Sequence, residues 1–433
     1  MVSIIKYLRR GPATSKEIQF ATMLSQPTVS RQIKDAGDTI VQIRDGRTVR
    51  YAATCNAFGA GDRIPLGTID SAGKCAKVAD VRPLNCGGFF IEPKTDDFPH
   101  VLFGDEGSGL FEDIPYFLYD MRPQGFIGRQ IAKKIAEQLE DFPANPKAWN
   151  TDHIGRYLIS KGDDLPGNFI FGEPNFMRIG QKPFPVSETD YPDLAASVLK
   201  GDPPGSSAGG EQSKFTAFNK KLNAHVIVKF SPKGENEVAV RWRDVLYTEY
   251  HASQVLTEHG YAAVVPNIYD LGGRLFLEFE RFDRVGEFGR IPMLSLDVLD
   301  REFVGYGNNW KKVVTELFQQ GLTDEQTLQH VEAMQQFGAL IQNNDMHLGN
   351  LSFSIQQDKI SLLPVYDMCA MEFAPKNGEV LPFEINSSPE DVFKEVFEMG
   401  QEFWSGILED ERISESFRDF VDQNIEQLNA KKI

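Results

Sequence analysis

The chain has 433 residues, of which 41% are hydrophobic and 11% aromatic, so general disorder is excluded and about two to four domains are expected. No apolar run approaches the roughly 18 residues of a membrane span, no signal peptide opens the chain, and the four cysteines lack the C-x-x-C spacing of a zinc site. The formal net charge is −17, yet residues 1–55 hold nine Lys/Arg and four Asp/Glu, so this +5 segment leaves −22 on the rest. We therefore expect a cytoplasmic protein with no membrane partner and with reduced, structural cysteines. We call residues 1–55 the head, and we expect this basic segment to be the only part that binds a polyanion.

The basic head begins with two predicted helices and a hairpin. Thr14 and Glu17 can form a capping box that starts the first helix, and a second helix follows from Ser25. Residues 39–51 alternate as two strands joined at Asp45 and Gly46, which is a strong hairpin signal.

This order of elements resembles the winged helix-turn-helix of bacterial transcription regulators, which implies that residues 1–55 bind duplex DNA. The second helix would place side chains at base edges in the major groove, and the arginines nearest the hairpin tip would meet phosphate or the minor groove. The alternative is a small helical domain that only tethers a partner. The candidate DNA-binding residues are Gln26, Thr28, Ser30, Arg31, Lys34, Arg44 and Arg47.

Residues 56–200 carry weaker signals. Residues 59–62 are expected to form a linker, and short β-like runs among Gly/Pro turns follow it. Helices are expected over residues 126–139, where isoleucine repeats every four residues, and over residues 149–161, with a weaker helix over residues 190–200.

The glycine-rich stretch 201–214 has two interpretations. Its composition alone favours a flexible linker, whereas glycine N–H groups and the charge of Lys214 could cradle a phosphate. The Walker A spacing is missing. The next elements favour the cradle, because the short apolar strand 225–230 carries Lys229 and the following helix carries Glu249, placed to pair with it. Without these neighbours, Lys229 would be an ordinary solvated side chain.

Residues 275–284 predict a strand that leads into a charged segment. In a two-lobed kinase, the chain between the lobes offers backbone donors and acceptors to adenine, and Glu280, Arg281 and Phe282 stand at that place. From residue 294 onward the pattern is mainly helical, interrupted by the loop described next.

The polar loop 342–353 follows an apolar-periodic helix and precedes an alternating strand, where a site can open. Asp345 and Asn350 have the D-x-x-x-x-N spacing of a kinase catalytic loop, and Asp367 ends an apolar run. Phosphoryl transfer needs a carboxylate that orients the hydroxyl nucleophile and oxygen ligands that hold magnesium. Asp345 suits the first task, and Asn350 with Asp367 suits the second. The alternative is that these polar residues only form a turn and a strand cap.

With these residues laid out, the chain from about residue 60 to 425 resembles the HipA family of bacterial serine/threonine kinases, known as toxins of toxin–antitoxin systems. Five stretches carry the resemblance in family order: 207–214, 226–230, 280–284, 344–350 and 365–367, with a further likeness at 113–125. The resemblance implies a two-lobed, protein-kinase-like fold that binds ATP and Mg2+.

The resemblance also implies roles for individual residues. Asp345 would be the catalytic base, Lys229 the phosphate-binding lysine, and Asn350 and Asp367 the metal ligands. Ser207 would be the autophosphorylated serine, whose modification switches the enzyme off, although Ser206 could take its place. The implied ATP-binding residues are Gly209, Gly210, Glu211, Gln212, Ser213, Lys214, Lys229, Glu280, Arg281, Phe282, His347, Tyr366 and Asp367.

Three features depart from the family pattern. Gly349 stands where many members have lysine, Glu211 stands where a small residue is usual, and the DNA-binding element is fused to the kinase as in the YjjJ or HipH subgroup. We expect an α+β multidomain fold whose carboxyl-terminal lobe is mainly helical. Its expected domains are the winged helix-turn-helix 1–55, a HipA-like amino-terminal subdomain 60–200, the ATP-binding part 201–283 and the helical lobe 284–433.

The favoured function is a toxin kinase that transfers the ATP γ-phosphate to Ser or Thr of a protein, such as a translation factor or an aminoacyl-tRNA synthetase. Its own head would bind DNA, and an antitoxin protein is a further expected partner. One alternative is a small-molecule kinase of the aminoglycoside or choline type. Another is a transcription regulator whose kinase-like domain only senses a nucleotide.

Overall fold

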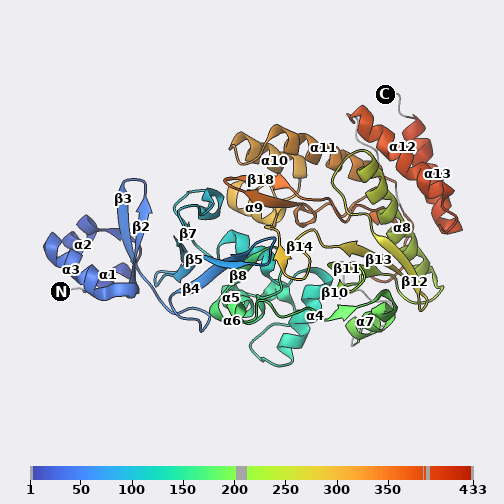
Figure 1. The fold of residues 1–433 in the computed structure, drawn as a ribbon. Helices are drawn as coiled ribbons and strands as arrows, with labels where there is room; N and C mark the ends of the chain where they lie inside the picture. The colour runs from blue at the N-terminus through green and yellow to red at the C-terminus, as the bar shows by residue number, and fades with distance from the viewer. Residues whose placement is uncertain (1–2, 201–211, 384, 387–390, 431–433) are drawn as a thin grey trace.

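The protein is described from a computed structural model, which describes residues 3–200, 212–383, 385–386 and 391–430 (Figure 1). The amino-terminal head lies at one end of the molecule, beyond the sheet formed by β4 to β8. Its small antiparallel sheet has the order β1-β3-β2. The head contains helices α1 (Ile4–Leu8), α2 (Ser15–Thr22) and α3 (Gln26–Ala36) and strands β1 (Ala13–Thr14), β2 (Ile40–Asp45) and β3 (Thr48–Ala53).

Local chemistry accounts for the boundaries of these elements. The predicted capping box is confirmed, because the Glu17 N–H donates to Thr14 Oγ1 and the Thr14 N–H donates to Glu17 Oε2. Ser25 precedes α3 as its cap residue, but its hydroxyl lies 2.9 Å from Thr28 Oγ1 and makes no bond to the helix backbone. The hairpin turns one residue later than predicted, because Asp45 still pairs with Thr48.

The middle region is built on an antiparallel sheet with the order β7-β6-β5-β4-β8. The helices predicted over 126–139 and 149–161 are present with slightly different ends. The strands are β4 (Ile64–Ile69), β5 (Cys75–Pro83), β6 (Phe89–Pro93), β7 (Leu110–Phe111) and β8 (Phe169–Phe171), and the helices are α4 (Gly125–Ala136), α5 (Thr151–Lys161) and α6 (Glu173–Phe176).

A second five-stranded sheet follows, with the order β12-β13-β11-β10-β9, in which only the β9–β10 pair is parallel. Apolar residues on one face of this sheet pack against the short helix α7. The strands are β9 (Pro185–Val186), β10 (Lys214–Asn219), β11 (Ala224–Phe230), β12 (Asn267–Leu271) and β13 (Arg274–Glu280), and the helices are α7 (Tyr191–Val198) and α8 (Glu237–Glu258).

The carboxyl-terminal part is mainly helical, with two small sheets inserted, β14-β15 and β16-β17-β18. Its elements are β14 (Arg284–Val285), β15 (Gly289–Arg290), β16 (Leu294–Ser295), α9 (Leu296–Phe303), α10 (Trp310–Gln319), α11 (Glu325–Leu340), β17 (Ser352–Gln356), β18 (Lys359–Leu362), α12 (Lys394–Glu409) and α13 (Glu415–Ala430).

One hydrophobic core joins the middle region to the helical part. It contains Leu66 of β4, Phe117, Trp242 of α8, Phe337 of α11 and Phe403 of α12, all of which are buried. Because these residues share one core, the body after the head packs as a continuous unit. All four cysteines are free thiols, as expected.

The head is packed against this body through its hairpin. Val41 and Ile43 of β2 and Ala52 of β3 form a separate buried cluster with Leu84 and Phe90 of the middle region. Strand β3 continues into this contact, since the Asn85 N–H donates to the Ala53 carbonyl over 2.8 Å. The hairpin is therefore covered along one face by the body, and only its tip extends away from it.

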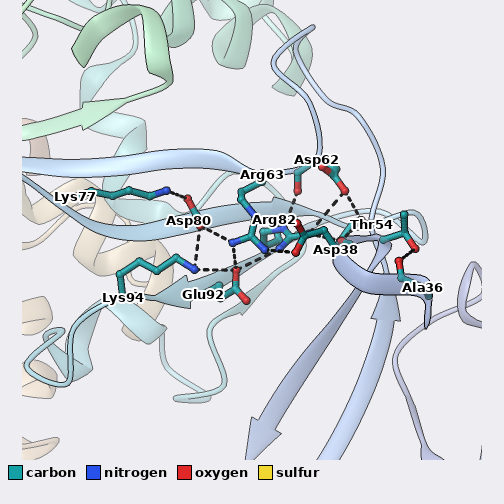
Figure 2. A network of polar contacts seen from close by, with 11 residues as sticks. Ala36, Asp38, Thr54, Asp62, Arg63, Lys77, Asp80, Arg82, Glu92 and Lys94 are labelled. Atoms are coloured by element: carbon teal, nitrogen blue, oxygen red, sulfur yellow. Dashed lines mark hydrogen bonds and ion pairs between the residues drawn. The ribbon is translucent and has the colours of Figure 1, made fainter. Parts of the chain in front are cut away.

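A polar network reinforces the same junction (Figure 2). Arg82 of β5 is fully buried, and it donates from Nε to the Asp62 carbonyl over 2.7 Å and from Nη2 to the Asp38 carbonyl over 2.5 Å. Arg63 pairs with Asp38 of the head and with Asp80 of β5, each over 2.7 Å. Residues 59–62, the expected linker, therefore connect the head to the body at a junction that is also held by these polar contacts.

We expect Arg82→Met to lower the free energy of unfolding by roughly 3 kcal/mol, because the carbonyls of Asp38 and Asp62 lose a buried donor and Glu92 loses its ion pair with Arg82. Chemical denaturation followed by circular dichroism measures this change. The matched control is Arg301→Met, whose partly exposed guanidinium pairs with Asp297 on the same helix and should cost less than about 1 kcal/mol. Equal stability of the two variants would contradict a structural role for the junction.

Candidate active site

Lys229 lies at the centre of the candidate site. It is on β11, directly opposite Lys214 of β10, and it is only 5% exposed. Its Nζ forms an ion pair with Oε1 of Glu249, a buried residue of α8. The same Nζ lies 5.3 Å from the ring centre of Phe279 on β13. A cation buried between apolar strands requires such a partner.

Asp367 completes a three-residue cluster from a distant part of the chain. Its Oδ1 contacts Lys229 Nζ, and its backbone has a left-handed φ of 57°. Burial alone would lower the pKa of Lys229, but Asp367 and Glu249 outweigh it and raise this pKa above its ordinary value. Burial alone would raise the pKa of Asp367, but Lys229 and Lys214 bring it below its ordinary value. An ammonium and an ionised carboxylate therefore lie side by side near neutral pH.

Asn343 connects this cluster to the polar loop after α11. Its Nδ2 donates to the Asp367 carbonyl over 3.1 Å, and its Oδ1 accepts from the Asp345 N–H over 3.1 Å. One buried amide thus sets the position of Asp367 relative to Asp345, whose side chain is exposed. The preceding Gln342 has a left-handed φ of 60°, which turns the chain from the helix into the loop.

Asn350 closes the loop on itself. It is buried, and its Nδ2 donates to the Asp345 carbonyl over 2.8 Å, so its amide oxygen is turned away from that bond. An amide oxygen and the Asp367 carboxylate are ligands of the kind that Mg2+ prefers when substrate phosphates supply the others. Within the described ranges, no group of three or more His, Cys, Asp or Glu residues could hold a metal by itself. The donor set therefore fits a metal shared with a nucleotide.

Two aromatic residues hold the loop from either side. The Tyr366 hydroxyl donates to the Gly349 carbonyl over 2.9 Å, and its ring lies 5.6 Å from that of Phe282. Trp310 Nε1 donates to the His347 carbonyl over 3.1 Å. His347 itself is exposed, and its charge helps to lower the pKa of Asp367. A Cβ on Gly349 would lie 3.1 Å from the His347 ring, so a lysine there would require this exposed ring to shift by a few tenths of an ångström.

The segment between the two lobes is held by its own ion pairs. Arg281 pairs with Asp283 through Nε at 2.9 Å and Nη2 at 2.8 Å, and Asp283 also pairs with Arg284. These two arginines lower the pKa of Asp283 against the effect of burial. The Arg281 N–H donates to the His225 carbonyl over 2.8 Å, so this donor is used by the sheet. The side chain and N–H of Arg281 therefore serve the fold in this structure.

The glycine-rich stretch lies mostly outside the described residues. This applies to Ser207, Gly209, Gly210 and Glu211. Of the residues that follow, Ser213 accepts a hydrogen bond from the Phe230 N–H over 3.0 Å, and the positive charge of Lys214 lowers the pKa of Asp367. The Nε2 of Gln212 is buried and has no partner among the described residues.

The candidate DNA-binding residues are mostly exposed. Thr28 is half-buried, and its hydroxyl bonds to Ser25. Arg50, further from the hairpin tip, lies where its charge lowers the pKa of Glu17. The exposed set consists of Gln26, Ser30, Arg31 and Lys34 on α3 and Arg44 and Arg47 near the hairpin tip.

Sequence reasoning assigned no role to Asn343, Trp310 or Asp283. Asn343 stands two residues before Asp345, so the Asn-Asn-Asp run was a signal for it. The contact of Trp310 with the loop depends on tertiary packing and left no local signal. Asp283 pairs with its sequence neighbours Arg281 and Arg284, within the stretch 280–284. No helix in the part of the chain that the structure describes is long and apolar enough to cross a bilayer.

Comparisons with known proteins show the family of the chain. Three families match: "YjjJ-like toxin, middle domain" over residues 60–179, "HipA-like C-terminal domain" over residues 206–428, and "Bacterial regulatory protein, arsR family" over residues 1–35. The curated "Toxin YjjJ" of Escherichia coli strain K12 is 33% identical over 444 residues, which cover 99% of this chain and 97% of that protein.

A solved structure is similar in fold. It belongs to the Shewanella oneidensis MR-1 toxin–antitoxin complex of HipA, HipB and operator DNA, with a TM-score of 0.52 and 16% identity. The match covers 85% of this chain and 96% of that chain. It confirms the expected α+β multidomain, kinase-like architecture with an amino-terminal helix-turn-helix. The chain therefore belongs to the HipA-like toxins, within the YjjJ group that carries a fused helix-turn-helix.

Proposed function

We propose that the chain is a kinase that transfers the γ-phosphate of ATP to a serine or threonine hydroxyl of a protein. The observation that supports this most is the continuous chain of contacts from Glu249 and Lys229 through Asp367 and Asn343 to Asp345. Membership of the HipA-like toxins agrees with it. Asp367 lies 138 positions from Lys229 in the sequence, yet the two residues form one ion pair inside the molecule.

The proposed roles follow from the chemistry of each group. Lys229, held by Glu249, would neutralise the α- and β-phosphates of ATP. Asp367 and the amide oxygen of Asn350 would hold Mg2+, which supplies charge neutralisation on the phosphates when bound. Asp345 orients the substrate hydroxyl and takes its proton. As the hydroxyl oxygen bonds to the γ-phosphorus, the bond from phosphorus to the bridging oxygen breaks and ADP leaves.

Residues at the edge of the cluster would complete the nucleotide site. Lys214 begins β10 opposite Lys229, and Gln212 and Ser213 precede it. The Nε2 of Gln212, which has no partner within the described ranges, suits a phosphate oxygen. His347 and Tyr366 flank the metal ligands. Ser207 remains our proposed autophosphorylation site, with Gly209 to Glu211 covering the phosphates.

We also propose that the head binds duplex DNA and that an antitoxin protein is a further partner. The helix-turn-helix match and the exposed basic residues of α3 support DNA binding. The solved complex of HipA and HipB contains operator DNA. Duplex DNA is therefore the ligand to test with this chain.

Asp345→Asn and Asp367→Asn should each reduce phosphate incorporation by about 10²–10⁴-fold, because one removes the proton acceptor and the other a metal ligand. The measurement is labelling of the purified chain with γ-labelled ATP and Mg2+, with mass spectrometry locating the phosphate at Ser207. Asp422→Asn, at an exposed position of α13, is the control and should label like the unaltered chain. Undiminished label in either active-site variant would refute these roles.

Asn343→Asp keeps an acceptor for the Asp345 N–H but loses the donor to the Asp367 carbonyl. We expect kcat to fall about 10–100-fold while the KM for Mg-ATP changes less than about threefold, because the variant displaces catalytic groups without touching the nucleotide. Steady-state kinetics separates the two constants. A rise in KM with unchanged kcat would assign Asn343 to nucleotide binding instead.

Arg31→Ala combined with Lys34→Ala should weaken binding to duplex DNA and flatten the slope of log K against log salt by about 1.8, one phosphate contact per side chain. Fluorescence anisotropy with a mixed-sequence duplex at several salt concentrations measures both quantities. Lys220→Ala combined with Lys221→Ala, exposed between β10 and β11, is the control. If the two double variants bind alike, the DNA contact lies elsewhere.

A further inference from the structure

A pocket beside the polar loop is not used by the nucleotide site. It has a volume of about 440 Å³ and lies between the start of α10, one face of α11 and Asp391. Two loop residues also line it, Asn343 and Met346, and they stand on either side of Asp345 in the chain. The pocket therefore opens next to the residue that we propose as the base.

Three amide side chains that line this pocket each use their oxygen as an acceptor for a backbone N–H. Gln335 Oε1 accepts from the Lys311 N–H, Gln336 Oε1 accepts from the Phe393 N–H, and Asn309 Oδ1 accepts from the Lys312 N–H, each over 2.9 Å. Because each oxygen is held by a backbone N–H, each NH2 group is turned the other way. All three residues line the pocket, and each NH2 group keeps hydrogen-bond donors that a ligand bound there can reach.

The charges around the pocket leave a small negative excess. Lys311 is paired with Glu332, so these two lining charges compensate each other. Asp391 remains as a further exposed carboxylate. The side of the pocket at Asp391 therefore suits a positively charged ligand group. The charge of −22 on the rest of the chain favours the same kind of ligand.

We propose that this pocket receives the polypeptide segment next to the phosphorylated serine or threonine of a protein substrate. The NH2 groups of Gln335 and Gln336 bind main-chain carbonyls of that segment, and Asp391 binds a lysine or arginine side chain. Met346, the residue after Asp345, lines the pocket, so an extended peptide, which advances about 3.3 Å per residue, can reach from one to the other. Main-chain carbonyls are the acceptors that every polypeptide offers and a small-molecule substrate lacks. This inference rests on the proposed kinase function.

The test uses the full chain and a peptide library with one central serine or threonine, in which each flanking position is fixed in turn. Gln335→Glu keeps the acceptor for the Lys311 N–H and replaces the NH2 donor by a negatively charged acceptor oxygen, a change of charge that the control below shares. We expect its kcat/KM for peptides to fall about 10-fold, with an unchanged KM for Mg-ATP. Gln329→Glu is the matched control, with the same change at an exposed position on the same helix outside the pocket.

Asp391→Asn supplies the second measurement. The unaltered chain should prefer Lys or Arg at one flanking position by about 5-fold or more, and Asp391→Asn should lose this preference. If the unaltered chain phosphorylates peptides but neither variant differs from it, the docking site is overturned and the kinase function stands. If the unaltered chain binds Mg-ATP and phosphorylates no peptide, the proposed function is overturned together with the docking site.

Discussion

The buried ammonium of Lys229, held between the carboxylates of Glu249 and Asp367, is the interaction on which the rest of the structure depends. An unpaired charge at this depth would cost several kcal/mol, so strand, helix and loop must meet at this point. The sheet supplies the lysine, α8 supplies the first carboxylate, and the segment after β18 supplies the second. The packing of α8 supports this meeting, because α8 contacts both β13 of the second sheet and α12 of the helical part.

The loop beside this cluster is held by contacts that lie outside the reacting groups. Asn343 positions Asp345 relative to Asp367, and Trp310 holds the backbone at His347. Both residues also line the neighbouring pocket. Asn343 and Trp310 thus hold the loop that carries the proposed base, and they also form part of the surface where we place the polypeptide substrate.

The head and the body form a firm junction. Apolar residues of the hairpin pack on Leu84 and Phe90, and the buried Arg82 binds carbonyls on the head side of the junction. These contacts fix the direction of α3 relative to the active site (Figure 1). The basic head and the acidic body are therefore joined by both apolar and polar contacts.

The sequence by itself determined the features that depend on neighbours along the chain. The capping box at Thr14, the helices after it, the hairpin, and the strand that carries Lys229 all follow from local hydrogen bonding and side-chain periodicity. Motif spacing also pointed to Asp345, Asn350 and Asp367 as one set. Only the tertiary structure decided that Asp367 meets Lys229, that Asn343 bridges them to Asp345, and that the hairpin docks on the body. Such contacts join residues far apart in sequence, and they depend on packing that no local pattern records.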